Sequence, residues 1–240
     1  MVVAIIDNNV TLMTPDSGRG KGYRTALSPD QNPRDFRFIP AKQVGDPRNQ
    51  EFLANCTHVI LSGSADDWAT GNDQLKPETV QKMKGVITWL QKYEGKVLGV
   101  CFGHQMLAIV EDLMGHEPPQ SFTAIKIKNM RPREAQPERG NIAVPITITH
   151  PNELVATATM WGQMNHGQEV EWSDALGERF QIWGETAHCR VAIIKHRHRP
   201  WYGVQFHPET GANFPRTIAP NIKDATQRHG QQLLQRFLSL

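Results

Sequence analysis

One segment of the chain reads Lys96-Val97-Leu98-Gly99-Val100-Cys101-Phe102-Gly103-His104-Gln105-Met106-Leu107-Ala108. Its apolar run, residues 97–100, predicts a short buried strand, and residues 102–114 predict a helix with one apolar face. Cys101 lies between the two, with Gly99 and Gly103 two residues away on either side. This spacing is typical of a nucleophile elbow, in which a strand turns sharply into a helix and lifts one side chain clear of the sheet.

The elbow favours chemistry at Cys101. Glycine accepts strained dihedral angles and close backbone approach at the least cost, which suits the two positions that flank the turn. The first turn of a helix offers unpaired N–H groups and the positive end of the helix dipole, and both favour a thiolate. The alternative interpretation is an inert cysteine buried in a strand. The flanking glycines and the strand-to-helix context favour a reactive cysteine.

A nucleophilic cysteine needs a base, and a second segment supplies a candidate: Trp201-Tyr202-Gly203-Val204-Gln205-Phe206-His207-Pro208-Glu209. Residues 202–206 predict a strand, and His207 and Glu209 follow it two residues apart, so their side chains start on the same face. The Glu209 carboxylate would then hold the His207 imidazole in one tautomer. His-x-Glu also occurs in zinc deaminases, but the Pro-Cys-x-x-Cys half of that signature is missing here. An inert surface turn is the other alternative, and the cysteine elbow argues against it.

These two segments together resemble the class I (triad) glutamine amidotransferases, such as the glutaminase domains of anthranilate synthase, carbamoyl phosphate synthetase and GMP synthetase. The two motifs stand in that family's order and at about its separation. The resemblance implies that Cys101 is the nucleophile, His207 the acid and base, and Glu209 the group that orients His207. It also implies hydrolysis of L-glutamine to glutamate and ammonia through a cysteinyl thioester.

The resemblance also points to the groups that would hold the oxyanion. The segment Ser62-Gly63-Ser64-Ala65 stands where the family has Ser-Gly-Gly-Pro or a variant of it. Gly63 matches the first glycine, and Ser64 stands at the second. By resemblance, backbone N–H groups near Gly63 or Ser64 and near Phe102 are expected to bind the oxyanion.

Two further features are expected to line the glutamine pocket, again by resemblance. Gln105 follows the elbow, and Asn165, His166 and Gly167 match the family's Asn-His-Gly or Ser-His-Gly segment. We expect both features to bind the amino-acid end of the substrate. His166 itself is expected to be a hydrogen-bonded structural residue and not a catalytic one.

The order of the predicted elements indicates an α/β fold. Strands at 2–6, 36–39 and 58–61 alternate with helical segments, which predicts a doubly wound, mostly parallel sheet flanked by helices. The resemblance implies the flavodoxin-like fold of the class I family. Parallel strands present their carboxyl ends at one edge, where Gly63, Cys101 and His207 should meet. We expect residues 1–240 to form a single glutamine amidotransferase domain.

Later parts of the chain show other patterns. Alternation of apolar and polar residues in 124–128 and 142–149 predicts an antiparallel extension of the parallel core, and 180–185 with 191–195 predict a hairpin. Two polar segments rich in glycine and proline, 15–34 and 210–223, are interpreted as inserted loops, and a closing helix is expected over 225–238.

Composition narrows the biochemical setting. The formal net charge is +2 over 240 residues, so neither nucleic acid nor a membrane is implied as a partner. No apolar run approaches transmembrane length, and the N-terminus lacks the pattern of a signal peptide. Three cysteines do not make a disulfide framework, which predicts a reducing, cytoplasmic location. No metal or organic cofactor is required by the candidate residues.

The sequence leaves the destination of the ammonia open. The family passes ammonia to a synthetase, and these 240 residues contain no P-loop motif, so a separate synthetase or amidating partner is expected. The alternative is a stand-alone hydrolase of γ-glutamyl amides or peptides with the same three residues. A third interpretation is a catalytically silent regulatory protein, which the joint presence of Cys101, His207 and Glu209 argues against.

Overall fold

The computed structural model describes residues 1–9, 18–27, 36–114, 121–122, 124–130, 142–210 and 218–240. Within these residues, nine strands form one sheet in the order β2-β1-β3-β4-β11-β10-β9-β6-β7. The first five run parallel to one another. They are β2 (Phe36–Pro40), β1 (Val3–Asp7), β3 (His58–Leu61), β4 (Lys96–Val100) and β11 (Trp201–Val204). The predicted α/β fold with a mostly parallel core is confirmed.

The predicted antiparallel extension is also present, with one correction. Beyond β11 the sheet continues with four antiparallel strands: β10 (Ile193–His196), β9 (Phe180–Glu185), β6 (Ile142–Ile148) and β7 (Thr159–Met164). The predicted strand at 124–128 does not join them. Its place is taken by β5 (Ile127–Asn129), which pairs with β8 (Gln168–Val170) in a separate small sheet. Alternation predicts a strand but not its partner, which explains the error.

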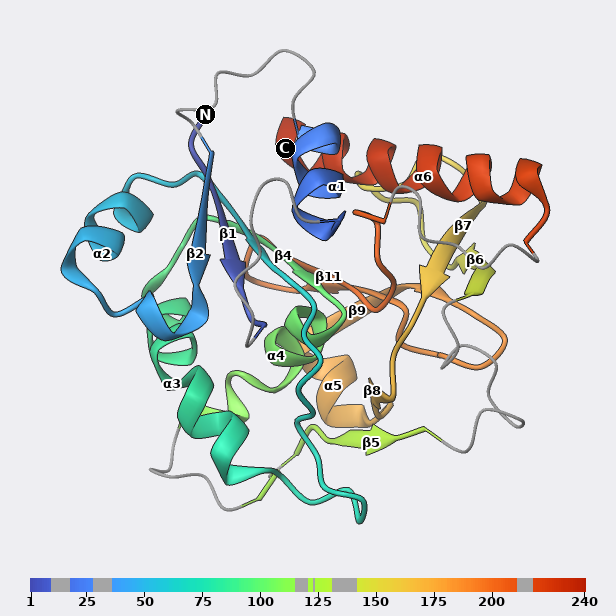
Figure 1. Ribbon diagram of the computed structural model, residues 1–240. Coiled ribbons are helices and arrows are strands. Elements are labelled where there is room, and N and C mark those ends of the chain that lie inside the picture. Colours follow the sequence, from blue (N-terminus) through green and yellow to red (C-terminus); the bar gives the residue numbers. More distant parts are fainter. Residues whose placement is uncertain (10–17, 28–35, 115–120, 123, 131–141, 211–217) are drawn as a thin grey trace.

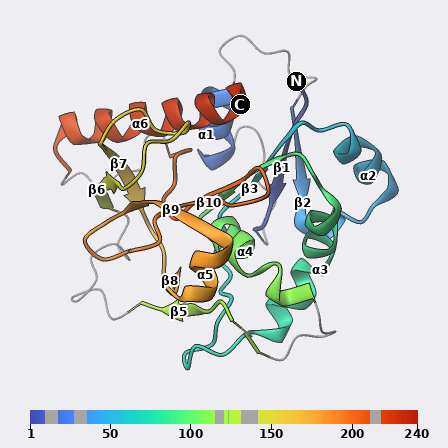
Figure 2. The same cartoon turned by 180° about the vertical axis from the view of Figure 1, so that it is seen from behind.

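Helices cover both faces of the sheet. Along β1, the side chains of Ala4 and Ile6 enter one core and that of Ile5 enters the other. The first core contains residues of α2 (Pro47–Ala54), α3 (Pro77–Lys92) and α4 (Phe102–Ile109); the second contains residues of α1 (Gly18–Leu27) and α6 (Pro220–Ser239). Figure 1 shows α1 and α6 together at the top of the molecule and α2 with α3 at the left. Figure 2 shows the short α5 (Asp174–Arg179) beside the small sheet from behind.

One expected helix is shorter than predicted. The helix expected over 102–114 ends at Ile109, and a separate 3₁₀ turn, η3, spans Asp112–Met114. The Asp112 carboxylate accepts hydrogen bonds from the backbone N–H of Ile125 at 2.6 Å and from Arg179 at 2.7 Å. These hydrogen bonds join the 3₁₀ turn to residues distant in sequence, and they occur where the α-helix has ended. No helix among the described residues is long and apolar enough to cross a membrane.

Both predicted insertions contain helix. Helix α1 occupies residues 18–27 of the segment interpreted as a loop, while 15–17 and 28–34 lie outside the described residues. Helix α6 starts at Pro220, so the last residues of the second predicted loop are helical, and 211–217 lie outside the described residues. Glycines lower helix propensity, but packing of α1 on the rest of the protein outweighs that local preference. Pro220 is at the first position of its helix, where proline is well tolerated.

Candidate active site

The elbow at Cys101 is formed as predicted, but the strain lies on the cysteine itself. Cys101 has φ 51° and ψ −105°, whereas no described glycine has a positive φ. The two flanking glycines serve close packing. A Cβ atom on Gly99 would lie 2.5 Å from the Gly103 carbonyl oxygen, and one on Gly103 would lie 2.3 Å from that of Leu61. Backbone strain of this kind at a non-glycine residue is typical of functional sites.

The parallel pairing of β4 with β11 brings the two predicted motifs together. Val100 is in register with Val204, and the Cys101 N–H donates to the Val204 carbonyl at 2.8 Å. Three residues after Val204, the His207 N–H donates to the Gln163 carbonyl in β7 at 2.9 Å. The carboxyl ends of neighbouring parallel strands therefore place Cys101 and His207 at the same edge of the sheet, as expected.

His207 and Glu209 form a buried pair. Nδ1 of His207 lies 2.8 Å from Oε1 of Glu209, and the two residues are only 4% and 2% exposed. The Cys101 side chain also interacts with the His207 ring and raises the pKa of this histidine. Because Glu209 occupies Nδ1, Nε2 is the ring nitrogen left for the sulfur. The three side chains therefore lie in the order carboxylate, imidazole, thiol.

The surroundings of His207 favour its charged form. Burial alone lowers the pKa of His207, but the negative charge of Glu209 and the sulfur of Cys101 outweigh it and raise this pKa to about 10. At neutral pH the ring is therefore an imidazolium. A charged donor beside the sulfur is the arrangement that favours a thiolate.

The predicted oxyanion loop, residues 62–65, lies directly beside the pair. A Cβ atom on Gly63 would be 2.8 Å from Cε1 of His207 and 3.5 Å from Cβ of Cys101, so only glycine fits between them. Among the described residues, the N–H groups of Gly63, Ser64 and Phe102 have no acceptor. The predicted donors therefore lie near the thiol.

Residues at the end of β1 hold this loop in place. The Asn9 side-chain amide donates to the Gly63 carbonyl at 3.1 Å, and the Ser62 hydroxyl donates to the same oxygen at 2.9 Å. The Ser64 hydroxyl donates to the Asn8 carbonyl at 2.9 Å. Sequence reasoning assigned no role to Asn8 and Asn9. The available signal was their position directly after β1. Because β1 and β3 are neighbouring parallel strands, residues that follow them lie at the same edge of the sheet.

Two of the predicted pocket residues meet at one carbonyl group. Nε2 of Gln105 donates to the Gln168 carbonyl at 2.7 Å, and Nδ1 of His166 lies 3.0 Å from the same oxygen. Asn165 is exposed, and Gly167 is half-buried with its carbonyl accepting from Met130 at 2.9 Å. The structure therefore brings Gln105 and the segment 165–167 together, with His166 buried and hydrogen-bonded.

Two more glutamines and a tryptophan belong to this region and were missed. Oε1 of Gln168 accepts from the backbone N–H groups of Trp68 and Ala69, and the Trp68 ring stacks on Phe102 at a centroid distance of 4.6 Å. Nε2 of Gln205 lies 3.6 Å from Sγ of Cys101. Gln205 falls inside the strand predicted over 202–206, so no local signal distinguished it from ordinary sheet residues.

His104 plays no part in the buried pair. It is fully buried, and a Cβ atom on Gly203 would lie 2.6 Å from its Nδ1. Burial lowers the pKa of His104 to about 3, so the ring is neutral at pH 7. It fills space between α4 and β11. In the part of the chain that the structure describes, no group of three His, Cys, Asp or Glu side chains could hold a metal ion.

The sequence of this chain matches the model of a known protein family. The model for glutamine amidotransferase class-I matches residues 35–215. The GMP synthase (glutamine-hydrolyzing) of Mannheimia succiniciproducens is 30% identical over 174 residues, which are 70% of this chain and 28% of that protein. The chain thus spans less than a third of such relatives. A GMP synthase (glutamine-hydrolyzing) subunit from Thermoplasma volcanium is 26% identical over 180 residues, 73% of this chain and 74% of that protein.

Solved structures show the same fold. A putative GMP synthase subunit from Thermoplasma acidophilum has a TM-score of 0.66 at 18% identity, over 100% of this chain and 92% of the other. A glutamine amidotransferase from Thermotoga maritima has a TM-score of 0.66 at 16% identity, over 100% and 99% of the two chains. The glutaminase domain of a Trypanosoma brucei CTPS with bound acivicin has a TM-score of 0.60 at 14% identity, over 100% and 94%.

Proposed function

This chain belongs to the class-I glutamine amidotransferase family, and we propose that it hydrolyses L-glutamine to glutamate and ammonia through a thioester on Cys101. One observation carries the proposal: the His207 imidazole lies between the Glu209 carboxylate and the Cys101 sulfur, with Gly63 packed against both reacting side chains. This order of carboxylate, imidazole and nucleophile is the one that a triad requires.

The first half of the reaction forms the thioester. The Cys101 thiolate attacks the carboxamide carbon of glutamine, and the carbonyl electrons move onto oxygen. N–H groups of Phe102 and of Gly63 or Ser64 bind this oxyanion; the loss of one such donor typically costs about 3 kcal/mol of transition-state stabilisation. The His207 imidazolium then donates its proton to the departing nitrogen, the C–N bond breaks, and ammonia leaves.

The second half of the reaction restores the enzyme. Neutral His207 takes a proton from a water molecule as that water attacks the thioester carbon. The C–S bond breaks, glutamate is released, and Cys101 and His207 return to thiolate and imidazolium. Glu209 stabilises the imidazolium and keeps Nδ1 protonated throughout, so that Nε2 performs both proton transfers. Gln105 and residues 165–167 are proposed to bind the amino-acid end of the substrate.

We further propose that the ammonia passes to a separate synthetase or amidating partner. In the relative from Mannheimia succiniciproducens the matching region is 28% of the protein, whereas the relative from Thermoplasma volcanium matches over 74% of its length and is named as one subunit of its enzyme. The second arrangement, a glutaminase chain beside a separate synthetase, is the one we propose here. L-glutamine and that partner are then the two molecules this chain must recognise.

The test is the release of glutamate and ammonia from L-glutamine by the purified chain, with Cys101→Ala as the control. Release that depends on Cys101 supports the proposal, and an increase on adding a captured synthetase supports the partner. Release that persists in Cys101→Ala refutes the nucleophile. Rapid turnover of γ-glutamyl peptides, with L-glutamine left unchanged, would instead identify a stand-alone γ-glutamyl hydrolase.

A further inference from the structure

Gln205 is the second polar side chain at the sulfur of Cys101. It follows β11 directly, is completely buried, and has Nε2 at 3.6 Å from Sγ. We propose that Gln205 is a further catalytic residue, which donates a hydrogen bond to the Cys101 sulfur and stabilises it as the thiolate. This inference rests on the proposed function only in taking Cys101 as the nucleophile.

The neighbouring amides fix which end of the Gln205 side chain faces the sulfur. The oxygen and nitrogen of a carboxamide have nearly the same shape, so their positions follow from hydrogen-bond partners. The backbone carbonyl of Gln168 can only accept, and Gln105 therefore presents Nε2 to it at 2.7 Å. The same Nε2 lies 3.2 Å from Gln205, which must present its oxygen there. The nitrogen of Gln205 is left to face the sulfur.

A donor in this position favours the thiolate over the thiol. A neutral thiol is a weak acceptor, whereas hydrogen bonds to a charged group are about twice as strong as neutral ones. Cys101 is only 5% exposed, so bulk water is a poor substitute for the amide. An amide also takes no proton from the thiol. His207 can therefore act as acid and base while Gln205 stabilises the negative charge.

The hydrogen bonds that join Gln168, Gln105 and Gln205 give Gln105 a positioning role. Its amide nitrogen bridges the Gln168 carbonyl and the Gln205 oxygen, and all three residues are buried. If Gln105 lost its amide, the side chain of Gln205 could rotate and present either end to the sulfur. We therefore expect Gln105 to act on Cys101 through the orientation of Gln205.

The experiment compares Gln205→Met with the wild-type chain. Methionine keeps the length of the side chain and removes the donor. The measured quantities are the rate of Cys101 alkylation by iodoacetamide as a function of pH, followed by mass spectrometry, and kcat/KM for L-glutamine. We expect the midpoint of the alkylation profile to move upward by about one pH unit, the size of one hydrogen bond to a charged group. Loss of the same interaction should lower kcat/KM about tenfold.

Two further variants complete the design. Gln50→Met is the matched control, because the Gln50 amide donates to the Val44 carbonyl between α2 and the turn that precedes it. It should leave both measurements as in the wild type. Gln105→Met should shift the alkylation midpoint in the same direction as Gln205→Met, but by less.

An alkylation midpoint unchanged in folded Gln205→Met would overturn the role of Gln205, whatever its glutaminase activity. If that variant does not fold, Gln105→Met decides: an unchanged midpoint there overturns the inference. The outcome is separable from the proposed function. A wild-type chain that is alkylated at Cys101 yet hydrolyses no glutamine, either alone or with the captured synthetase, would refute the function, while a shift in Gln205→Met would still support the thiolate contact.

Discussion

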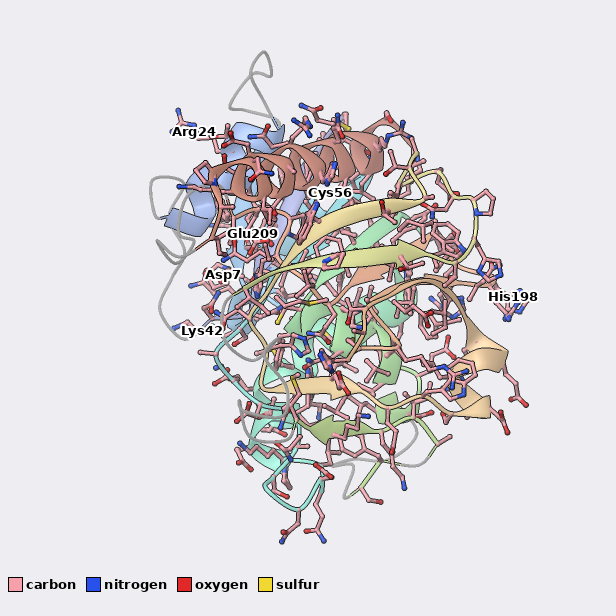
Figure 3. The ribbon with its side chains drawn as sticks, turned by 90° about the vertical axis from the view of Figure 1, so that its right-hand side faces the viewer. Asp7, Arg24, Lys42, Cys56, His198 and Glu209 are labelled. Atoms are coloured by element: carbon pink, nitrogen blue, oxygen red, sulfur yellow. The ribbon has the colours of Figure 1, made fainter. Side chains whose placement is uncertain are left out.

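Gly22 in α1 packs against the backbone of Glu209: a Cβ atom at position 22 would lie 1.6 Å from the Glu209 carbonyl oxygen. The preceding residue, Pro208, is approached in the same way by Gly230 of α6, where a Cβ atom would lie 2.4 Å from the carbonyl oxygen. Figure 3 shows Glu209 beneath α6, with Arg24 of α1 at the outer surface. Helices from the two ends of the chain thus fix the turn that carries His207 and Glu209.

Gly22→Ala should therefore impair the site through Glu209. The new methyl group cannot fit without a shift of α1 or of the turn, and overpacking of this kind typically costs about 1 to 3 kcal/mol. We expect a lower free energy of unfolding in urea and a fall in glutamine hydrolysis of roughly tenfold or more, because small displacements of catalytic groups are costly.

Gly85→Ala is the matched control for that substitution. Gly85 is also helical, in α3, and the nearest outside atom to a Cβ there is 3.9 Å away. Alanine should be neutral or stabilise the protein by up to about 1 kcal/mol through helix propensity. If Gly22→Ala behaved like Gly85→Ala, the close contact with Glu209 would have no consequence for stability or activity.

The backbone strain at Cys101 gives a second prediction. With φ at 51°, position 101 favours glycine over any residue with a Cβ atom. Cys101→Gly should be more stable than Cys101→Ala by about 1 kcal/mol, and both should lack glutamine hydrolysis. Thermal or urea unfolding of the two variants checks this. Greater stability of the alanine variant, the usual order at unstrained positions, would contradict the strain.

The pair formed by His207 and Glu209 predicts how stability depends on pH. The pKa of His207 is raised from about 6.5 to about 10, so between these values the folded state binds more protons than the unfolded state. The stabilisation by this pair is fully present below pH 6.5 and is lost as pH rises through about 10. Glu209→Gln removes the carboxylate and with it much of this stabilisation.

The advantage of the wild-type chain over Glu209→Gln in free energy of unfolding should therefore be large at neutral pH and shrink toward pH 10. Urea unfolding of both chains at a series of pH values measures it. Comparing the two chains cancels the titration of other groups that both contain. A difference in stability that stayed constant over this interval would show that His207 does not titrate as the pair predicts.

Asn9 offers a test of the loop that holds the predicted oxyanion donors. Asn9→Ala removes one of the two hydrogen bonds to the Gly63 carbonyl. A hydrogen bond of this kind contributes about 1 kcal/mol, so kcat for glutamine should fall roughly fivefold. Alkylation of Cys101 should be unchanged, because the loop acts on the oxyanion and not on the thiolate.

The control for Asn9→Ala is Asn55→Ala. The Asn55 side chain donates to the Glu51 carbonyl on the exposed side of α2, far along the chain from the elbow. It should leave kcat unchanged. Equal alkylation and equal kcat in both variants would mean that Asn9 does not orient the loop.

The local patterns in the sequence were sufficient for the elbow and for the ends of the parallel strands. The apolar run 97–100 and the glycines at 99 and 103 predicted the strand, the turn and the helix start that the structure contains. Such signals succeed because hydrophobic periodicity and turn chemistry act over a few residues. The rule that parallel strands end at one edge then predicted that Cys101 and His207 lie together, although they are 106 positions apart in the sequence.

Helix α1 shows where local patterns failed. Its glycines and polar residues favour a loop by propensity, yet Tyr23 is buried in the second core and Gly22 packs on Glu209. Long-range packing therefore decided a helix that local preference disfavours. The small sheet of β5 and β8 was missed for a related reason, because the choice of strand partner depends on tertiary contacts.

The amino-acid sequence alone predicted the chemical groups proposed for the site, Cys101, His207 and Glu209, and the strand ends that carry them. Their immediate surroundings emerged only with the folded chain: Gly22 against Glu209, Asn9 on the loop at Gly63, and Gln205 at the sulfur. The physical reason is the range of the interactions. Periodicity and turn preference act between near neighbours, whereas these contacts join residues that come together only when the whole sheet and both of its helical layers are packed.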